Sequence, residues 1–291
     1  MTTIETPQST DRPRWRAWAA ISPLLVWLLA FVVVPTAMLF IYSFFKNAGY
    51  SEVERAFTWD NYSLAFSPVY LRIFARSAVY AGLTTALCAV VGYPVAYYIG
   101  RAPAGRRNRL LMLVMIPFMT SFLIRTFAWT TILDHQGVLN TVLRAFHIIP
   151  GLLDENFEVL RTPAAVMIAL VYTYLPFMIL PIYGSVEKLD ESLLEAASDL
   201  GAGPLRTFAR VVLPLTMPGA GAGVLMVFVP AVAMFAVTHV MSGGTIHLIG
   251  DVIEEQFGAG GNLPFGSALG MVLLVAFIVT FFLFTRRERA G

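Results

Sequence analysis

Long apolar runs separated by short polar segments dominate the pattern of this chain. Six of them carry almost no charge, at residues 20–44, 77–99, 110–132, 163–183, 219–241 and 265–285. A bilayer core about 30 Å thick is crossed by a helix of about 20 apolar residues. The pattern therefore predicts an all-α polytopic membrane protein with six transmembrane helices in residues 20–285, framed by tails at residues 1–19 and 286–291.

The basic residues fall unevenly on the two sides that six spans create. Both tails then lie on one side, together with segments 100–109 and 184–218. Most arginine and lysine residues are on that side: Arg12, Arg14, Arg16, Arg101, Arg106, Arg107, Arg109, Lys188, Arg206, Arg210, Arg286, Arg287 and Arg289. Fewer lie opposite: Lys46, Arg55, Arg72, Arg76, Arg144 and Arg161. Because Arg- and Lys-rich loops stay in the cytoplasm, we expect both tails to be cytoplasmic.

The composition agrees with a membrane location. Hydrophobic residues make up 57% of the chain, charged residues 13%, and the mean hydropathy is +0.71. Soluble domains carry about 25% charged residues, so a soluble fold is poorly supported. The net charge is +2 without a block of basic residues, so nucleic acid is not an expected partner.

Motifs for catalysis or cofactor binding are absent from the sequence. The lysines, Lys46 and Lys188, are not in the Gly-Lys-Ser/Thr context of a phosphate-binding loop. The four histidines never approach HExxH spacing, and Cys88 has no neighbouring ligand for a metal. We therefore expect no catalytic residue, no metal site and no cofactor in this chain. If transport consumes ATP, another subunit must bind it.

The inner segment 184–218 has the pattern of two short helices. Asp190 can cap the first helix, and Gly201 suits the left-handed residue that ends it. Pro204 is tolerated at the first position of a second helix, which we expect to end at Pro214. One face of the first helix is apolar, with Leu193, Leu194, Ala196, Ala197 and Leu200. On periodicity alone, this is a surface helix pair that closes the bundle.

The residues themselves indicate a more specific role. The run Glu195-Ala196-Ala197-Ser198-Asp199-Leu200-Gly201-Ala202, followed by Phe208 and Leu213-Pro214, closely resembles the EAA loop of ABC-importer permeases. In that family the loop docks on the cytoplasmic ATPase and transmits its closure to the membrane spans. The resemblance implies coupling residues at Glu195, Ala196, Ala197, Asp199, Gly201, Ala202, Arg206, Phe208, Arg210 and Pro214. Small alanines would allow close approach of the ATPase, and Glu195, Arg206 and Arg210 would offer charge pairs.

A wider set of motifs extends the resemblance over most of the chain. In order, these are Asp60-Asn61-Tyr62, Gly92-Tyr93-Pro94-Val95-Ala96, Ile116-Pro117-Phe118, Leu123-Ile124-Arg125, Leu175-Pro176-Phe177-Met178, Val186-Glu187-Lys188-Leu189-Asp190, Leu213-Pro214-Leu215-Thr216-Met217-Pro218-Gly219 and Pro264-Phe265-Gly266. Together they are similar to the permease subunits of spermidine/putrescine importers. The resemblance implies a type I permease fold in a bacterial inner membrane. It also implies a second, related permease, two ATPase subunits that carry ATP and Mg²⁺, and an extracytoplasmic solute-binding protein.

A few polar and aromatic residues within the runs are candidates for the translocation path or its gate: Arg125, Tyr172, Tyr174, Met234, Phe235 and His239. Arg125 lies deep in the third run, where a charge is costly and faces the interior or a partner. A structural role for Arg125 stays equally open. The permeases of polyamine importers usually have an acid near the position of His239. Histidine is neutral or positive, so this departure keeps other solutes open.

Three alternatives to a polyamine importer follow from the same features. The first is an ABC importer of another small charged solute, such as an amino-acid derivative or an opine. The second is a secondary transporter driven by an ion gradient. It would normally show repeat symmetry and carboxylates inside the membrane, whereas the six runs contain neither Asp nor Glu. The third is a membrane scaffold without transport activity.

Overall fold

The computed structural model describes residues 14–50, 52–145 and 159–290, which are mostly helical. Within them, five helices are long and apolar enough to cross a membrane: Ile21–Tyr42, Pro68–Gly100, Pro163–Val186, Pro204–Ala233 and Leu263–Phe282. A sixth crossing exists if the bent pair Ala104–Met119 and Phe122–Leu133 counts as one span. The predicted helical membrane fold is confirmed, while several of the predicted boundaries are not.

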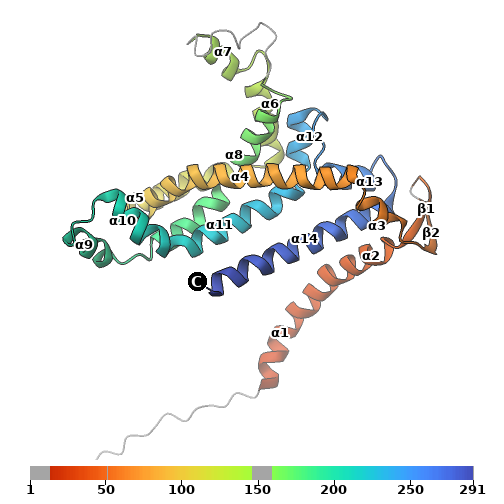
Figure 1. Ribbon diagram of the computed structural model, residues 1–291, viewed down its shortest axis with the longest axis horizontal. Helices are drawn as coiled ribbons and strands as arrows, with labels where there is room; N and C mark the ends of the chain where they lie inside the picture. Colours follow the sequence, from red (N-terminus) through yellow and green to blue (C-terminus); the bar gives the residue numbers. More distant parts are fainter. Residues whose placement is uncertain (1–13, 51, 146–158, 291) are drawn as a thin grey trace, which may run out of the picture.

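The first span is built from α1 (Arg14–Leu28), a π turn η1 (Leu29–Val33) and α2 (Val34–Tyr42). The π turn ends two residues before Pro35. Proline lacks an N–H and clashes with the carbonyl four residues before it, so the backbone widens and Val34 N–H donates to Leu29 O, five residues back. The apolar window of this span is 0% buried, and in Figure 1 the helix curves away from the bundle. Its apolar surface is therefore open to lipid or to another chain.

The segment after the first span forms a β-hairpin, which the apolar runs do not reveal. Strands β1 (Phe45–Gly49) and β2 (Glu52–Phe57) pair antiparallel and lead into α3 (Asp60–Ala65). The side chain of Asn61 ties α3 to the start of the hairpin by donating to the carbonyl oxygens of Ser43 and Phe45, at 2.9 and 2.8 Å. Aromatic residues favour extended strands, which explains why this aromatic-rich segment leaves the helical pattern.

The core of the bundle consists of α4 (Pro68–Gly100), α8 (Pro163–Val186) and α11 (Leu213–Ala233), which pack on one another. Helix α4 begins at Pro68, well before the predicted start at residue 77. Glycines permit the close packing of α11 on α8, because a Cβ at Gly219 would collide with Pro181 and Ser185. Figure 1 shows α4 running the whole length of the bundle.

The predicted third span is not one continuous helix. Helices α5 (Ala104–Met119) and α6 (Phe122–Leu133) meet at 89°. Thr120 and Ser121 between them are extended, with ψ of 154° and 131°, and the Thr120 hydroxyl donates to Pro117 O at 2.7 Å. Hydroxyl side chains that bond nearby backbone carbonyls compete with the helix, which explains the break. Beyond it, α6 and α7 (Val138–Ala145) project from the bundle (Figure 1).

The fifth span also differs from the prediction, because it starts and ends earlier. It runs through α10 (Pro204–Thr207), a π turn η2 (Phe208–Val212) and α11, so Pro214 does not end a helix. As before Pro35, a π turn accommodates the proline: Leu213 N–H donates to Phe208 O, five residues back. The span stops at Ala233, since Met234 is extended with ψ of 120°. The predicted span at 219–241 is therefore interrupted, and α12 (Ala236–Ser242) is a separate helix.

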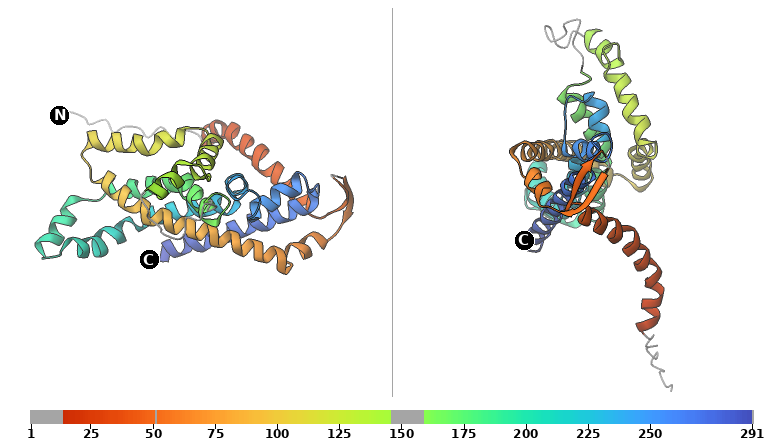
Figure 2. Two further views of the ribbon diagram at one scale, coloured as in Figure 1. Left: turned by 90° about the horizontal axis from the view of Figure 1, so that it is seen from above. Right: turned by 90° about the vertical axis from the view of Figure 1, so that its right-hand side faces the viewer.

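The C-terminal part packs along the first span and the core. Helix α13 (Ile249–Phe257) lies between α11 and α14 (Leu263–Ala290), and α14 contacts α2 and α3. Helix α14 continues to Ala290 through the predicted tail at 286–291. In both Figure 1 and Figure 2 (left), the β-hairpin lies at one end of the bundle, and α10 and α9 (Glu191–Asp199) lie at the other.

Candidate functional site

The predicted helix pair exists at the end of the bundle opposite the hairpin. Asp190 caps α9, because its carboxylate accepts the Ser192 N–H at 3.0 Å, and this bond lowers the pKa of Asp190. The helix ends in a Schellman turn: Gly201 has a φ of +75° and donates to Ser198 O, and Ala202 N–H donates to Ala197 O. Helix α10 then begins at Pro204. The caps and the turn are those that the sequence predicts.

The helix pair exposes apolar side chains to water. Leu200 is 89% exposed, Leu205 85% and Leu193 45%. No residue of α9 is buried, and only Leu194 and Ala197 of its apolar face are half-buried, where α9 lies near α10 and η2. Exposed apolar patches with polar surroundings mark interaction sites. The sequence predicted the apolar face correctly, and its exposure points to a surface that another protein covers.

The base of the helix pair is fixed to the core by aromatic contacts. Phe208 makes edge-to-face contacts with Tyr93 and Tyr97 of α4, with ring centroids 5.5 and 6.1 Å apart. Tyr93 also shares a hydrogen bond with Thr216 at the start of α11. Such aromatic pairs contribute about 0.5–1.5 kcal/mol beyond area burial. These contacts join the helix pair to α4, and η2 continues directly into α11.

Two ion pairs hold the start of segment 184–218, one joining α9 to the end of α4 and the other joining the end of α8 to α5, and sequence reasoning missed both. Arg101 pairs with Glu191 at 3.3 Å, and Arg107 pairs with Glu187 at 3.0 Å. Partly exposed pairs of this kind contribute about 0–1 kcal/mol each, so they orient the loop more than they stabilise it. The sequence feature that could have indicated these pairs is the basic cluster at 101–109, which is predicted to lie on the same side of the membrane as Glu187 and Glu191.

The other predicted coupling residues are available to a partner. Glu195, Asp199, Arg206 and Arg210 are exposed, and none belongs to an ion pair within the residues that the structure describes. Their charges are therefore free to pair with another subunit.

The path candidates fall into two groups. Arg125 of α6 lies over the Phe118 ring at 5.6 Å, with a buried Nε that has no hydrogen-bond partner in the described part of the chain. Tyr172 of α8 contacts Trp129 of α6, with ring centroids 5.4 Å apart. Tyr174 is only 4% exposed and packs in the core of this chain. In this first group, only Tyr172 joins α8 to α6, while Arg125 contacts α5 and Tyr174 lies in the core.

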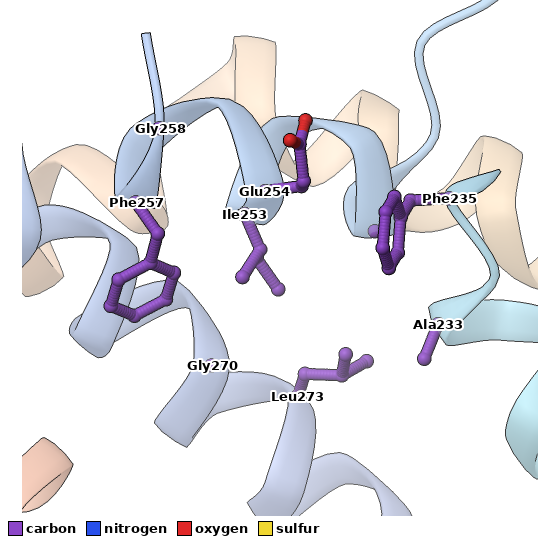
Figure 3. Close-up of a pocket in the computed structure, with 9 residues that line it drawn as sticks. Ala233, Phe235, Ile253, Glu254, Phe257, Gly258, Gly270 and Leu273 are labelled. Carbon is purple, nitrogen blue, oxygen red and sulfur yellow. The ribbon is translucent and has the colours of Figure 1, made fainter. Parts of the chain in front are cut away.

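The second group lies at the break that follows α11. Met234 and Phe235 form the break, and His239 is exposed on α12. Phe235 lines an open pocket of about 590 Å³ between the end of α11, helix α13 and helix α14. Figure 3 shows Ile253 and Leu273 bordering this pocket, while the side chain of Glu254 points away from it. The structure thus joins Phe235 to α13 residues that sequence reasoning did not single out, since they lie outside every apolar run.

The chain belongs to a family of transport proteins. The profile of the family described as "Binding-protein-dependent transport system inner membrane component" matches residues 90–289. The chain is thus a permease subunit of an ABC importer, a component of the bacterial inner membrane. It is not an enzyme, and ATP is hydrolysed by a separate subunit.

Individual relatives support the assignment over nearly the whole chain. It is 39% identical over 269 residues to the spermidine/putrescine transport system permease protein PotB of Haemophilus influenzae, covering 92% of this chain and 93% of the relative. It is 40% identical to PotB of Escherichia coli K12, covering 92% and 96%. In fold, it resembles a bacterial alginate ABC transporter solved in complex with an alginate pentasaccharide-bound periplasmic protein. There the TM-score is 0.75 at 18% identity, over 95% of this chain and 94% of the other.

Proposed function

We propose that the chain translocates a polyamine, spermidine or putrescine, that an extracytoplasmic binding protein delivers. The observation that carries the proposal is the identity of 39–40% over 92% of the chain to permeases named for these two solutes. The alternative is another small charged solute. It is favoured by His239, which stands on α12 where polyamine permeases usually have an acid.

The assembly that we propose contains two permeases, two ATPases that bind ATP and Mg²⁺, and one binding protein. A second permease is supported by the first span, whose apolar window is not buried in this chain. Cytoplasmic tails are supported by the concentration of Arg and Lys around the helix pair and the α4–α5 connection.

The proposed mechanism uses the helix pair as a lever. The ATPases close on ATP binding and press on the helix pair, where Leu200 after α9 and Leu205 of α10 are exposed. Phe208 passes the displacement to α4 through Tyr93 and Tyr97. Helix α11 moves together with α4. The break at Met234 allows α12 to move separately from α11. Phe235, His239, Arg125 and Tyr172 remain candidates for the lining of the path, whereas Tyr174 is buried in the core of this chain.

The test is uptake by the complete complex in proteoliposomes. Radiolabelled spermidine and putrescine, loaded on the binding protein, are expected to accumulate in an ATP-dependent manner. A complex whose ATPase cannot hydrolyse ATP is the control and should give only background. Uptake of neither polyamine, together with uptake of another charged solute, would establish the alternative. Uptake by the permease alone under an ion gradient would support a secondary transporter instead.

A further inference from the structure

Helix α5 packs on the bundle with one of its faces. Leu111 and Val114 of this face pack against the core, and Arg107 of the same face pairs with Glu187 at the end of α8, at 3.0 Å. In Figure 2 (left), α5 is the yellow helix at the outer edge of the bundle. The opposite face of α5 is therefore turned away from the core.

That opposite face combines two basic residues with an apolar stripe. Four exposed residues follow one another at a spacing of three or four positions: Arg106, Arg109, Leu113 and Ile116. Residues at this spacing lie on one face of a helix. Leu113 is 65% exposed and Ile116 is 60% exposed. At a rise of 1.5 Å per residue, the stripe reaches about 10 Å beyond Arg109.

The two arginines are not neutralised by acids of this chain. Within the described residues, neither Arg106 nor Arg109 belongs to an ion pair. Arg109 donates from Nε to the carbonyl oxygen of Gly105 at 3.3 Å, which occupies one of the five N–H donors of a guanidinium. Both positive charges are thus available to an anion.

An aromatic ring of α4 flanks the arginines. The guanidinium of Arg106 lies over the ring of Tyr98, 5.4 Å from its centre, and Tyr98 is 51% exposed. Exposed tyrosines are enriched where a membrane meets water. The ring and the start of the apolar stripe therefore place Arg106 and Arg109 at the level of the lipid headgroups.

The face of α5 has the two-part chemistry of a phospholipid. Guanidinium groups form strong hydrogen bonds with phosphate oxygens, and an acyl chain suits the apolar stripe above them. A second protein chain would have to supply acids opposite both arginines, because unpaired buried charges are costly. A negatively charged headgroup supplies the matching charge from the membrane itself.

We propose that this face of α5, together with Tyr98, binds an anionic phospholipid such as phosphatidylglycerol. The lipid comes from the membrane leaflet on the side of the helix pair. Arg106 and Arg109 hold its phosphate, and one acyl chain lies along Leu113 and Ile116. The proposal does not depend on which solute is transported.

The experiment uses the complete complex in proteoliposomes of phosphatidylethanolamine that contain a trace of a photoactivatable lipid. The probe is either phosphatidylglycerol or phosphatidylcholine, each with a diazirine at the same position of its acyl chain. After illumination and chymotrypsin digestion, mass spectrometry identifies the crosslinked peptides. The phosphatidylglycerol probe should crosslink to residues 110–119 with a yield several times that of the phosphatidylcholine probe.

Substitutions separate the basic site from general effects on the complex. Arg106→Gln and Arg109→Gln should each lower the phosphatidylglycerol yield about fivefold, the contribution of one basic residue near an anionic surface. Combined Arg106→Lys and Arg109→Lys keeps both charges and should keep most of the yield. The control combines Arg72→Gln and Arg76→Gln, which removes two exposed arginines near the other end of α4. It should leave the yield at α5 unchanged.

Three results would overturn the proposal. The first is equal or absent crosslinking of the two probes to residues 110–119 in the unsubstituted complex. The second is an unchanged phosphatidylglycerol yield in both Arg106→Gln and Arg109→Gln. The third is loss of the second permease or the ATPases from the purified complex when both glutamines are present, because this face of α5 is then a contact between subunits.

Discussion

At the scale of single residues, Asp251 is the buried acid with the clearest consequence. It is 6% exposed, and one of its oxygens has no hydrogen-bond partner in the described structure. Burial raises its pKa to about 6, although the Leu248 N–H, His239 and His247 act in the opposite direction. Between about pH 4 and pH 6 the folded chain therefore binds more protons than the unfolded chain. Stability should fall as the pH rises through this window and then level off.

The substitution Asp251→Asn should remove this pH dependence, because asparagine keeps an acceptor for Leu248 N–H but does not titrate. Thermal unfolding of the purified protein, followed by tryptophan fluorescence between pH 4 and pH 7, measures the effect. Between pH 4 and pH 7, the free energies of unfolding of the unsubstituted protein and of Asp251→Asn should diverge by at most about 3 kcal/mol. Parallel profiles would show that Asp251 keeps an ordinary pKa.

Glu195 gives a second prediction at this scale. It is exposed on α9 without an ion pair in the described part of the chain, so Glu195→Ala should leave thermal stability within about 0.5 kcal/mol. Coupled uptake should nevertheless be lost if Glu195 contacts the ATPase. The matched control is Glu191→Ala on the same helix, which removes the surface pair with Arg101 and the acidic side chain in the first turn of α9. Equal uptake in both variants would exclude a special role for Glu195.

At the scale of elements, the turn between α9 and α10 allows a comparison of two glycines. A Cβ added at Gly201 or at Gly203 would meet no atom within 4 Å, so added bulk reaches open space at both positions. Only Gly201 has a left-handed φ, +75°, whereas Gly203 has a φ of −69°. Gly201→Ala should therefore cost about 1–2 kcal/mol of local strain. It should also lower the number of solute molecules taken up per ATP hydrolysed.

Gly203→Ala should hardly change the number of solute molecules taken up per ATP hydrolysed, because the backbone conformation of Gly203 suits any residue. The measurement is the number of solute molecules taken up per ATP hydrolysed. If both variants behave alike, the left-handed turn does not control the lever.

Other features of the elements show where sequence reasoning succeeds and where it stops. The cap at Asp190 and the turn at Gly201 were predictable, because they depend on residues next to them in the chain. The interpretation of Pro214 as a helix end was wrong, because a π turn absorbs the proline. Whether a helix stops or widens depends on packing, here on Phe208 against α4, and local propensity does not contain that information.

At the scale of the whole molecule, hydropathy gave the number of apolar segments because lipid imposes a length on every span. It did not give the bend between α5 and α6 or the end of α11 at Ala233. Both breaks lie inside apolar runs. The composition therefore stays the same at the points where the helix is interrupted. The pocket was also beyond prediction, since it joins Phe235 to α13 and α14 through contacts distant in sequence.

The orientation and the bent pair can be tested together by cysteine labelling. The native Cys88 is buried, with 0% exposure, so it should not react with the maleimide. We place single cysteines by Glu52→Cys in the hairpin, Gln136→Cys after α6 and Ser198→Cys in α9, all at exposed positions. In intact cells whose outer membrane is permeable, an impermeant maleimide should label positions 52 and 136. Position 198 should react only after the inner membrane is opened.

This pattern requires that α5 and α6 together cross the membrane, since position 136 then lies on the side of the hairpin. If the pair instead turns back within the bilayer, position 136 becomes cytoplasmic, and the next span carries position 198 to the outside. Labelling of position 198 in intact cells would therefore contradict both the sixth crossing and the cytoplasmic location of the helix pair. The lever mechanism depends on that location, because ATP is available to the partner ATPases only in the cytoplasm.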